Sequence, residues 1–235
     1  DAGFNLGVTP NAEAGYYRID SKMYPIGVSI VVCTASDAAG NMGSSTFAVT
    51  VSEYSAPTAP FTILDDSTGG DCQHIGTWDA ASKTCTITED VTADSSDAII
   101  IGSDGITLQG DVNIQGVTTN YSYFGIFVDG KSNITLKDFN LLDFKYGVMA
   151  KNTDTLTIRD VTSDNVGWNV VNYQVHNSNN VILDNLVSTS NNLCYGQNYG
   201  CESEFFITNT NNVLFQDSTF GTIKIGNSHD VELSN

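Results

Sequence analysis

Basic residues are scarce in this 235-residue chain: Lys and Arg total 9 against 27 Asp and Glu, a formal net charge of -18. Because binding to nucleic acid requires Lys and Arg to neutralise phosphates, this balance argues against a nucleic-acid partner. No apolar run approaches the roughly 18 residues of a membrane-spanning helix. An initiator Met and a signal peptide are also missing, so Asp1 is either a processed mature end or the start of a cut fragment.

The excess of acidic residues has two interpretations. It keeps an extracellular protein soluble. Carboxylate oxygens are also the ligands that Ca²⁺ prefers, so a structural calcium ion is the second interpretation. The sequence identifies no ligand set for such an ion and indicates no other cofactor.

Five cysteines are present, and their spacing is not that of a zinc site. Cys72 and Cys85 are 13 residues apart, and Cys194 and Cys201 are 7 apart. Two local disulfides are the simpler interpretation, and they imply an oxidising, extracellular compartment. Cys33 remains, either buried and reduced or bonded to a cysteine outside this chain.

Two Asn-x-Ser/Thr triplets permit N-glycosylation, at Asn120 and at Asn133. Such triplets also arise by chance in a sequence rich in Asn. They agree with an extracellular protein without requiring one.

Residues 1–54 differ in pattern from the rest of the chain. Apolar residues alternate from Ile26 to Val32 and again from Phe47 to Val51, on either side of the turn "DAAGN". This pattern predicts two strands joined as a hairpin. Residues before Met23 show no clean strand set, and the Pro-containing "SAPTAP" at 55–60 is predicted to be a linker.

The stretch "YPIGVSIVVCTASDAAGN" followed by "FAVTV" resembles the closing half of a hyalin-repeat domain, an immunoglobulin-like β-sandwich of extracellular proteins. The resemblance covers only the last two or three strands of such a domain. It implies a small Ig-like β segment over 1–54, for which a complete domain would need opening strands of about 30 more residues.

A short unit recurs through the second part of the chain. Aligning its first apolar residue gives steps of 22, 25, 32 and 18 residues after Ile134, and a second apolar position lies eight residues before each one. The aligned pairs are Ile126 and Ile134, Val148 and Leu156, Tyr173 and Val181, Phe205 and Val213, and Ile223 and Val231. Short β runs at a period near 22 residues indicate a solenoid with two strands per unit. The leucine-rich repeat pattern and its helices are missing.

The segments "GIFVDGKSNITLKDF", "GVMAKNTDTLTIRDV", "YQVHNSNNVILDNL" and "FFITNTNNVLFQDS" resemble the parallel β-helix repeat family. The resemblance implies an all-β fold with a right-handed parallel β-helix over 61–235, in which 61–102 form the first coils or a cap. Equivalent residues should then stack from coil to coil: apolar residues in the core, and Asn133, Thr155, Asn180 and Asn212 at one corner.

Parallel β-helices often bind or cut polysaccharides, and pectate-lyase-like members use Asp-bound Ca²⁺ with an Arg or Lys base. The lyase-like candidates here are Lys137 with Asp138 and Arg159 with Asp160, which occupy matching positions on adjacent coils. A surface ladder of alternating charges explains the same residues without catalysis. The elements Gly-His-Gly and Arg-Ile-Lys of polygalacturonase-like enzymes are missing, so the sequence favours a protein that is not an enzyme.

Two further parts of the chain are candidates for a binding site. Asp129, Lys151 and His176 recur at matching positions on three coils, where a His beside an acid could act as a base. An insertion of about ten residues in the coil before Val213 carries Tyr195 and Tyr199 between Cys194 and Cys201. A loop closed by a disulfide and bearing tyrosines suits sugar or protein contacts, and a loop without function is the alternative.

The chain begins within one predicted fold and ends within another. Either it is a piece of a longer protein, or its open ends associate head to tail with other subunits. We therefore expect an extracellular structural or adhesive protein of a microbial cell surface or filament. The alternative is a β-helix protein that binds or cleaves polysaccharide.

Overall fold

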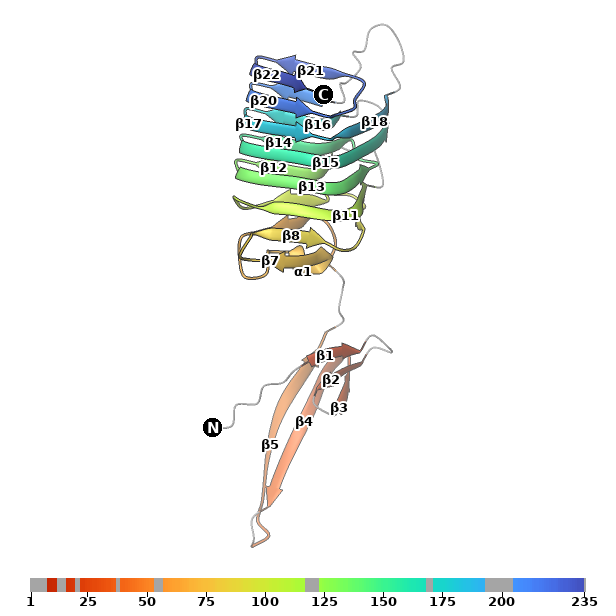
Figure 1. The fold of residues 1–235 in the computed structure, drawn as a ribbon. Coiled ribbons are helices and arrows are strands. Elements are labelled where there is room, and N and C mark those ends of the chain that lie inside the picture. The colour runs from red at the N-terminus through yellow and green to blue at the C-terminus, as the bar shows by residue number, and fades with distance from the viewer. Residues whose placement is uncertain are drawn as a thin grey trace. The chain divides into compact units, whose positions relative to one another are not determined.

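The computed structural model describes residues 8–11, 16–19, 22–36, 39–52, 57–116, 123–167, 171–192 and 205–234. Contacts divide the chain into two units, Asp1–Ala56 and Pro57–Asn235, and the division lies within residues 55–60. The described secondary structure is almost entirely β, with one short helix, which confirms the all-β class (Figure 1). None of the described helical structure is long and apolar enough to cross a membrane.

The first unit contains two antiparallel sheets. Its first sheet joins three short strands, β1 (Val8–Asn11), β2 (Tyr16–Ile19) and β3 (Lys22–Pro25). Sequence inspection found no clean strand set in this region, and the structure differs on that point. Backbone pairing between strands of only four residues forms this sheet, and such strands are too short to show a clear alternation of apolar and polar residues.

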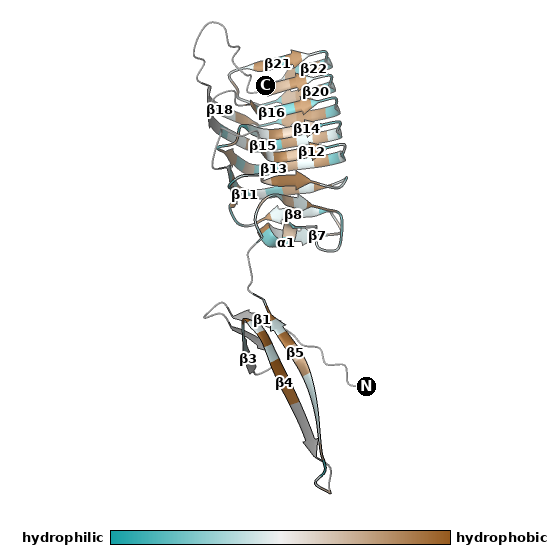
Figure 2. Ribbon diagram, turned by 180° about the vertical axis from the view of Figure 1, so that it is seen from behind, coloured by the Kyte–Doolittle hydropathy of each residue, from teal (hydrophilic) through white to brown (hydrophobic). Residues whose placement is uncertain are grey.

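The second sheet of the first unit is the predicted hairpin, made by β4 (Gly27–Ser36) and β5 (Met42–Val51). Gly27 pairs with Val51 and Ser36 with Met42, so the two strands match over their full length. Figure 2 shows apolar residues along both strands. Several of these side chains are exposed, including Val28 (67%), Ile30 (65%) and Phe47 (51%).

The second unit is built from two parallel sheets (Figure 1). The seven-stranded sheet contains β6 (Phe61–Ile63), β10 (Ile99–Ile101), β12 (Phe124–Asp129), β14 (Tyr146–Lys151), β16 (Val171–His176), β19 (Phe205–Thr208) and β21 (Ile223–Gly226). The ten-stranded sheet contains β7 (Gly76–Asp79), β8 (Thr84–Ile87), β9 (Val91–Ala93), β11 (Thr107–Gly116), β13 (Ser132–Leu142), β15 (Asp154–Gly167), β17 (Asn179–Asp184), β18 (Val187–Asn192), β20 (Asn211–Gln216) and β22 (His229–Ser234).

From β10 onward the chain alternates between the two sheets, except that β17 and β18 follow one another in the ten-stranded sheet, and strands of successive coils pair in parallel. The registers are those that the sequence repeat predicts. Ile126 pairs with Val148, and Val148 with Tyr173, in the seven-stranded sheet. In the ten-stranded sheet Ile134 pairs with Leu156, and Val181 pairs with both Leu156 and Val213.

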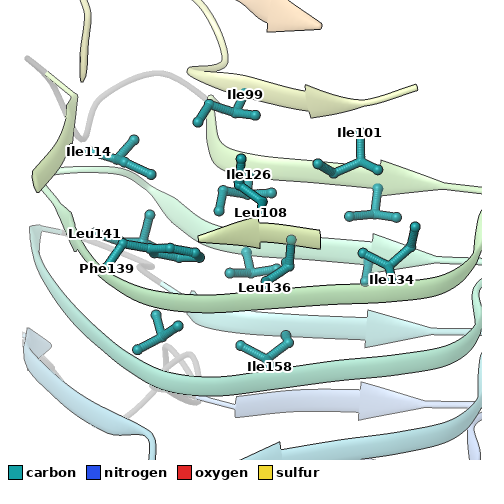
Figure 3. Close-up of a cluster of buried hydrophobic side chains, with 14 of the residues drawn as sticks. Ile99, Ile101, Leu108, Ile114, Ile126, Ile134, Leu136, Phe139, Leu141 and Ile158 are labelled. Atoms are coloured by element: carbon teal, nitrogen blue, oxygen red, sulfur yellow. The ribbon is translucent and has the colours of Figure 1, made fainter. Parts of the chain in front are cut away.

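The apolar core lies between the sheets, where side chains of successive coils stack on one another. Figure 3 shows Ile99, Ile126, Leu108, Leu136 and Ile158 among these layers. All five are at most 1% exposed. Burial at about 25 cal/mol per Å² of apolar surface makes this cluster the main source of stability in the unit.

The corner between the two sheets requires an unusual backbone. Asn133, Thr155, Asn180 and Asn212 all have φ between 53 and 60°. This left-handed conformation is disfavoured for most residues, and Asn tolerates it best among those with a side chain. The predicted corner column is therefore confirmed, including its Thr member.

Buried hydroxyl groups line the same corner on its inner side. The Ser178 Oγ accepts a hydrogen bond from the Thr153 N–H (3.1 Å) and donates one to the His176 carbonyl (2.8 Å). Thr210 repeats the pattern one coil later, accepting from the Ser178 N–H (3.4 Å). Each hydroxyl satisfies a backbone group that no strand partner reaches.

Side-chain amides form rows along the outside of the stack. Asn152 Nδ2 donates to Asp129 Oδ1 (2.8 Å), and Asn209 Nδ2 donates to Asn177 Oδ1 (3.0 Å). In four rows the Asn amide donates toward the preceding coil and the first member is an Asp. The other three of these rows are Asp90–Asn113–Asn140, Asp154–Asn180–Asn212 and Asp160–Asn185. The pair Asn211–Asn179 begins with an Asn instead, and Gln115 donates in the other direction, to Asp143.

Residues 61–102 include features that the repeat pattern did not predict. The helix α1 (Cys72–Ile75) precedes β7, which pairs antiparallel with β8. The Cys72–Cys85 disulfide is present as predicted, and both cysteines are fully buried. It attaches the helix to β8 and so closes the first part of the core.

Candidate functional site

A polar groove of about 510 Å³ lies on the ten-stranded sheet and contains three of the four lyase-like candidates. Lys137 and Asp138 come from β13, and Asp160 comes from β15. The remaining lining residues are Thr86 of β8, Gln109, Gly110 and Asp111 of β11, and Phe139 and Asn140 of β13. Arg159, the fourth candidate, lies beside Lys137 in the strand register.

A β-bulge in β11 shapes this groove. Gln109 pairs with Lys137 and Val112 pairs with Phe139, so Gly110 and Asp111 together oppose the single residue Asp138. A Cβ on Gly110 would lie 2.4 Å from the Ile87 carbonyl oxygen, so only Gly fits there. Bulges bend a strand and redirect its side chains, which accounts for the local recess in an otherwise regular sheet.

Both basic candidates are engaged in ion pairs. Lys137 Nζ lies 3.2 Å from Asp138 Oδ2, and Arg159 Nη1 lies 3.1 Å from Asp160 Oδ2. Asp160 Oδ1 also accepts a hydrogen bond of 2.8 Å from Asn185. A lyase base must be free to take a proton from the substrate, and neither cation has that freedom here.

Among the described residues, no three His, Cys, Asp or Glu side chains lie close enough together to hold a metal ion. The ladder Gln109–Lys137–Arg159–Asp184–Gln216 follows the strand register across five coils. This is the arrangement of alternating charged and polar residues that the sequence also allowed. The side chains of this ladder are suited to hydrogen bonding at the surface of the sheet.

The groove offers several hydrogen-bond acceptors. Gln109 Nε2 donates to Thr86 Oγ1 (3.0 Å), and Asn140 Nδ2 donates to Asn113 Oδ1 (3.2 Å), so each amide uses one of its two N–H groups within the protein. The amide oxygens of these two residues and the carboxylate of Asp111 remain to accept. Hydroxyl groups of a sugar are suitable donors for such a surface.

The second predicted column lies on the seven-stranded sheet. Asp129, Lys151 and His176 are register partners on β12, β14 and β16, as the alignment predicts. Lys151 Nζ lies 3.0 Å from Asp129 Oδ2. The hydrogen bond from Asn152, and then that Lys151 partner, hold the pKa of Asp129 below its usual value.

His176 is half-buried, and its Nδ1 is hydrogen-bonded to the Thr208 hydroxyl. Burial, and secondarily the positive charge of Lys151, lower the pKa of His176 from its usual value of 6.5. The ring is therefore neutral at neutral pH. Asp129 pairs with Lys151 and not with the imidazole, so the expected acid–base pair is not formed.

Other predicted site residues are placed less completely. Asn133 is exposed at its corner, while Asn120 lies outside the described residues. Tyr195 and Tyr199, with Cys194 and Cys201, also lie outside them. Cys33 is on β4 opposite Ser45, with its side chain not described. The second disulfide, both glycosylation sites and the tyrosine loop thus stay predictions.

Sequence reasoning missed the bulge at Gly110 and Asp111. The spacing gave no clear signal, because the bulge adds a single residue whereas the step from Ile106 to Ile134 is six residues longer than the next one. It also missed the outward residues two positions before the Asp129, Lys151 and His176 column. Those residues are Phe127, Met149 and Gln174.

No protein-family model matches this chain, and no curated protein matches it. Among solved structures, the fold is similar to that of a protein from Parabacteroides merdae whose structure is titled as a "putative glycosyl hydrolase". The TM-score is 0.50 at 12% sequence identity, and the match covers 65% of this chain and 79% of that one. At this identity the likeness concerns the fold alone.

Proposed function

We propose that this protein is an extracellular polysaccharide-binding protein whose stacked coils form a right-handed parallel β-helix, and that it holds its ligand without cleaving it. The observation that carries this proposal is the polar groove at the β11 bulge. Concave sites lined by a few convergent polar groups are the usual places where small ligands and short polymer segments bind.

Three observations support the parts of the proposal. Alternation of strands between two parallel sheets supports the β-helix. The buried Cys72–Cys85 disulfide supports an oxidising compartment outside the cell. A fold shared with a protein titled as a glycosyl hydrolase is compatible with a carbohydrate ligand, although the likeness by itself concerns architecture.

Binding without cleavage follows from the ion pairs in and beside the groove. Cleavage of a glycosidic bond by elimination needs a base that abstracts a proton, together with a cation that stabilises the resulting negative charge. Lys137 and Arg159 are each neutralised by the following Asp. The groove can therefore orient sugar hydroxyl groups, while the two basic residues that a lyase mechanism would use are held as charged partners of carboxylates.

The test compares two glutamines at equivalent positions of the same ladder. Gln109 lines the groove, whereas Gln216 lies at the other end of the ladder and outside it. Affinity electrophoresis against a panel of neutral and acidic polysaccharides should reveal a ligand whose retention falls several-fold in Gln109→Ala and is unchanged in Gln216→Ala. Equal effects of both substitutions, or no retention by the unmodified protein, would contradict the proposal.

Cleavage is measured on the same samples by the release of new reducing ends. We expect none from the unmodified protein after prolonged incubation with a retained polysaccharide. Release that disappears in Lys137→Ala would instead assign the lyase-like activity to this groove.

A structural or adhesive role in a surface layer or filament is the second candidate, supported by the exposed apolar side chains of β4 and β5. Side chains such as Ile30 and Phe47 are normally covered in a stable assembly. Sedimentation over a range of concentrations should show self-association that Ile30→Thr weakens and that Ser44→Thr, on the paired strand, leaves unchanged. A monomer at all concentrations would refute this role for the hairpin.

A further inference from the structure

Aromatic and basic side chains gather on the outer surface of the seven-stranded sheet. The outward residues of one register row are Ile100, Phe127, Met149, Gln174, Phe206 and Lys224. We call the aromatic–lysine face the set formed by Phe124, Phe127, Tyr146, Phe206, Lys145, Lys151, Lys224 and His176. Its strands are stacked directly on one another in Figure 1.

Each lysine of this face lies over an aromatic ring. Lys151 Nζ is 5.3 Å from the centre of the Phe127 ring, and Lys224 Nζ is 5.1 Å from that of Phe206. Lys145 Nζ is 5.5 Å from the centre of the Tyr146 ring. Such contacts fix the positions of ammonium groups that would otherwise sample many rotamers.

The aromatic rings form two clusters. Phe124 lies between Phe127 (5.3 Å between ring centres) and Tyr146 (5.2 Å). Farther along the stack, the Phe206 ring meets the edge of His176 at 5.3 Å. Since β12 and β19 are three strand spacings apart in the sheet, the two clusters are separated by about 14 Å along the stack.

The charge on this face differs from that of the chain as a whole. Lys83, Lys137, Lys151 and Arg159 each form an ion pair with an Asp. Lys145 and Lys224 form none with any residue that the structure describes. In a chain of net charge -18, two cations without a carboxylate partner on one sheet face constitute a local positive feature.

The chemistry of the face specifies its ligand. Flat apolar rings that recur along one direction suit a polymer with its own rings, because the C–H faces of sugars pack on aromatic side chains. Ammonium groups beside those rings suit anionic substituents. Nucleic acid fits less well, since its dense phosphates require many more basic groups than the face provides.

We propose that the aromatic–lysine face binds an acidic polysaccharide whose chain lies along the stack of coils, in contact with the Phe127 and Phe206 clusters and with its anionic groups at Lys145 and Lys224. This is a second site on a different sheet from the groove. It stands independently of the function proposed for the groove.

The test uses dextran sulfate and neutral dextran of the same length, which share a backbone and differ in charge, with alginate as the carboxylate source. Retention of the two acidic polymers is expected in affinity electrophoresis at low salt, and neutral dextran should not be retained on this face. The double variant Lys145→Gln/Lys224→Gln and the single variant Phe206→Ala should each weaken retention roughly tenfold or more. Lys83→Gln removes one positive charge outside the face and serves as the control.

Several outcomes would overturn the inference. The first is that the unmodified protein retains no acidic polymer. The second is that the double variant and Lys83→Gln show equal retention. The third is that a single-stranded oligonucleotide binds more tightly than either acidic polysaccharide. Retention of dextran sulfate but not of alginate would identify the ligand as a sulfated polysaccharide. Retention of alginate but not of dextran sulfate would identify it as a carboxylated one. Thermal unfolding of each variant shows that the fold is retained.

The groove and the face are distinguished by the same assay. If Gln109→Ala abolishes retention of the acidic polymers and the face variants do not, the groove binds these polymers and this inference fails. If the face variants abolish retention of acidic polymers and Gln109→Ala has no effect on any ligand, the face binds and the function proposed for the groove fails.

Discussion

Lys137 on β13 and Arg159 on β15 are register partners, yet each forms its ion pair with the Asp that follows it in its own coil. Two like charges on adjacent strands would repel if they were unpaired. Pairing within each coil makes these two coils locally neutral at this position. The ladder can therefore continue without either residue having a role in catalysis.

We expect the double substitution Lys137→Ala/Arg159→Ala to have little effect on stability. Both ion pairs are partly exposed, and such pairs contribute about 0–1 kcal/mol each. The free energy of unfolding, measured by urea titration, should fall by less than about 2 kcal/mol in total. A larger loss would mean that the stems of these side chains pack against the sheet more strongly than their charges interact.

Val181→Asp should unfold the stack, whereas Ile182→Asp should not. Val181 is fully buried between coils, and Ile182, the next residue on β17, is 38% exposed. An unpaired carboxylate in the core costs several kcal/mol, so we expect a loss of about 4 kcal/mol or more at Val181 and of about 1 kcal/mol at Ile182. Similar urea midpoints for the two variants would contradict the strand register.

The buried hydroxyl of Thr210 is tested by two substitutions of similar size. Thr210→Val keeps the shape of the side chain but leaves the Ser178 N–H without its acceptor, whereas Thr210→Ser keeps the hydroxyl. An unsatisfied buried donor costs about 1–3 kcal/mol, and Thr210→Val should lose that much free energy of unfolding. Thr210→Ser should lose less. If Thr210→Ser loses more free energy of unfolding than Thr210→Val, the buried hydroxyl groups do not contribute to stability.

The protein should become less stable as the pH falls below about 6.5, in part through His176. The folded state lowers the pKa of this imidazole, so the unfolded chain takes up the proton first. Stability from this residue is complete above pH 6.5 and decreases until the pH reaches the lower pKa of the folded state. Urea midpoints between about pH 8 and pH 5 should depend less on pH in His176→Gln.

His229 provides the matched control for this measurement. It is exposed on β22, so His229→Gln removes an imidazole of the same chain without disturbing the buried contacts of His176. If His176→Gln and the unmodified protein show the same dependence, the lowered pKa of His176 does not contribute to stability.

The coil registers could be predicted because the apolar positions are repeated at a fixed offset. Ile126 and Ile134 begin a pattern that Val148 with Leu156 and Tyr173 with Val181 continue, and each pair occupies its predicted strands. Burial on one face of each strand enforces this register, since a shift of one residue would expose the whole apolar row.

Irregular features could not be predicted in the same way. The bulge at Gly110 depends on the close approach of the Ile87 carbonyl, which only the folded chain reveals. The sequence identified Asp129, Lys151 and His176 as one column. That Asp129 pairs with Lys151 and not with His176 depends on how far each side chain reaches. Sequence periodicity determines which residues are neighbours, whereas side-chain geometry determines which neighbours interact.

The amide rows give the stack a chemical direction. In four of the rows the Asn side chains donate toward the preceding coil, and an Asp such as Asp129 or Asp90 receives the first bond. Aligned amide dipoles polarise one another, and the carboxylate at their donor end is stabilised as an anion. The two ends of a row are thus electrically unlike, much as the two ends of an α-helix are. A coil that stacked in the reversed orientation would place like ends together, so this polarity selects one sense of stacking.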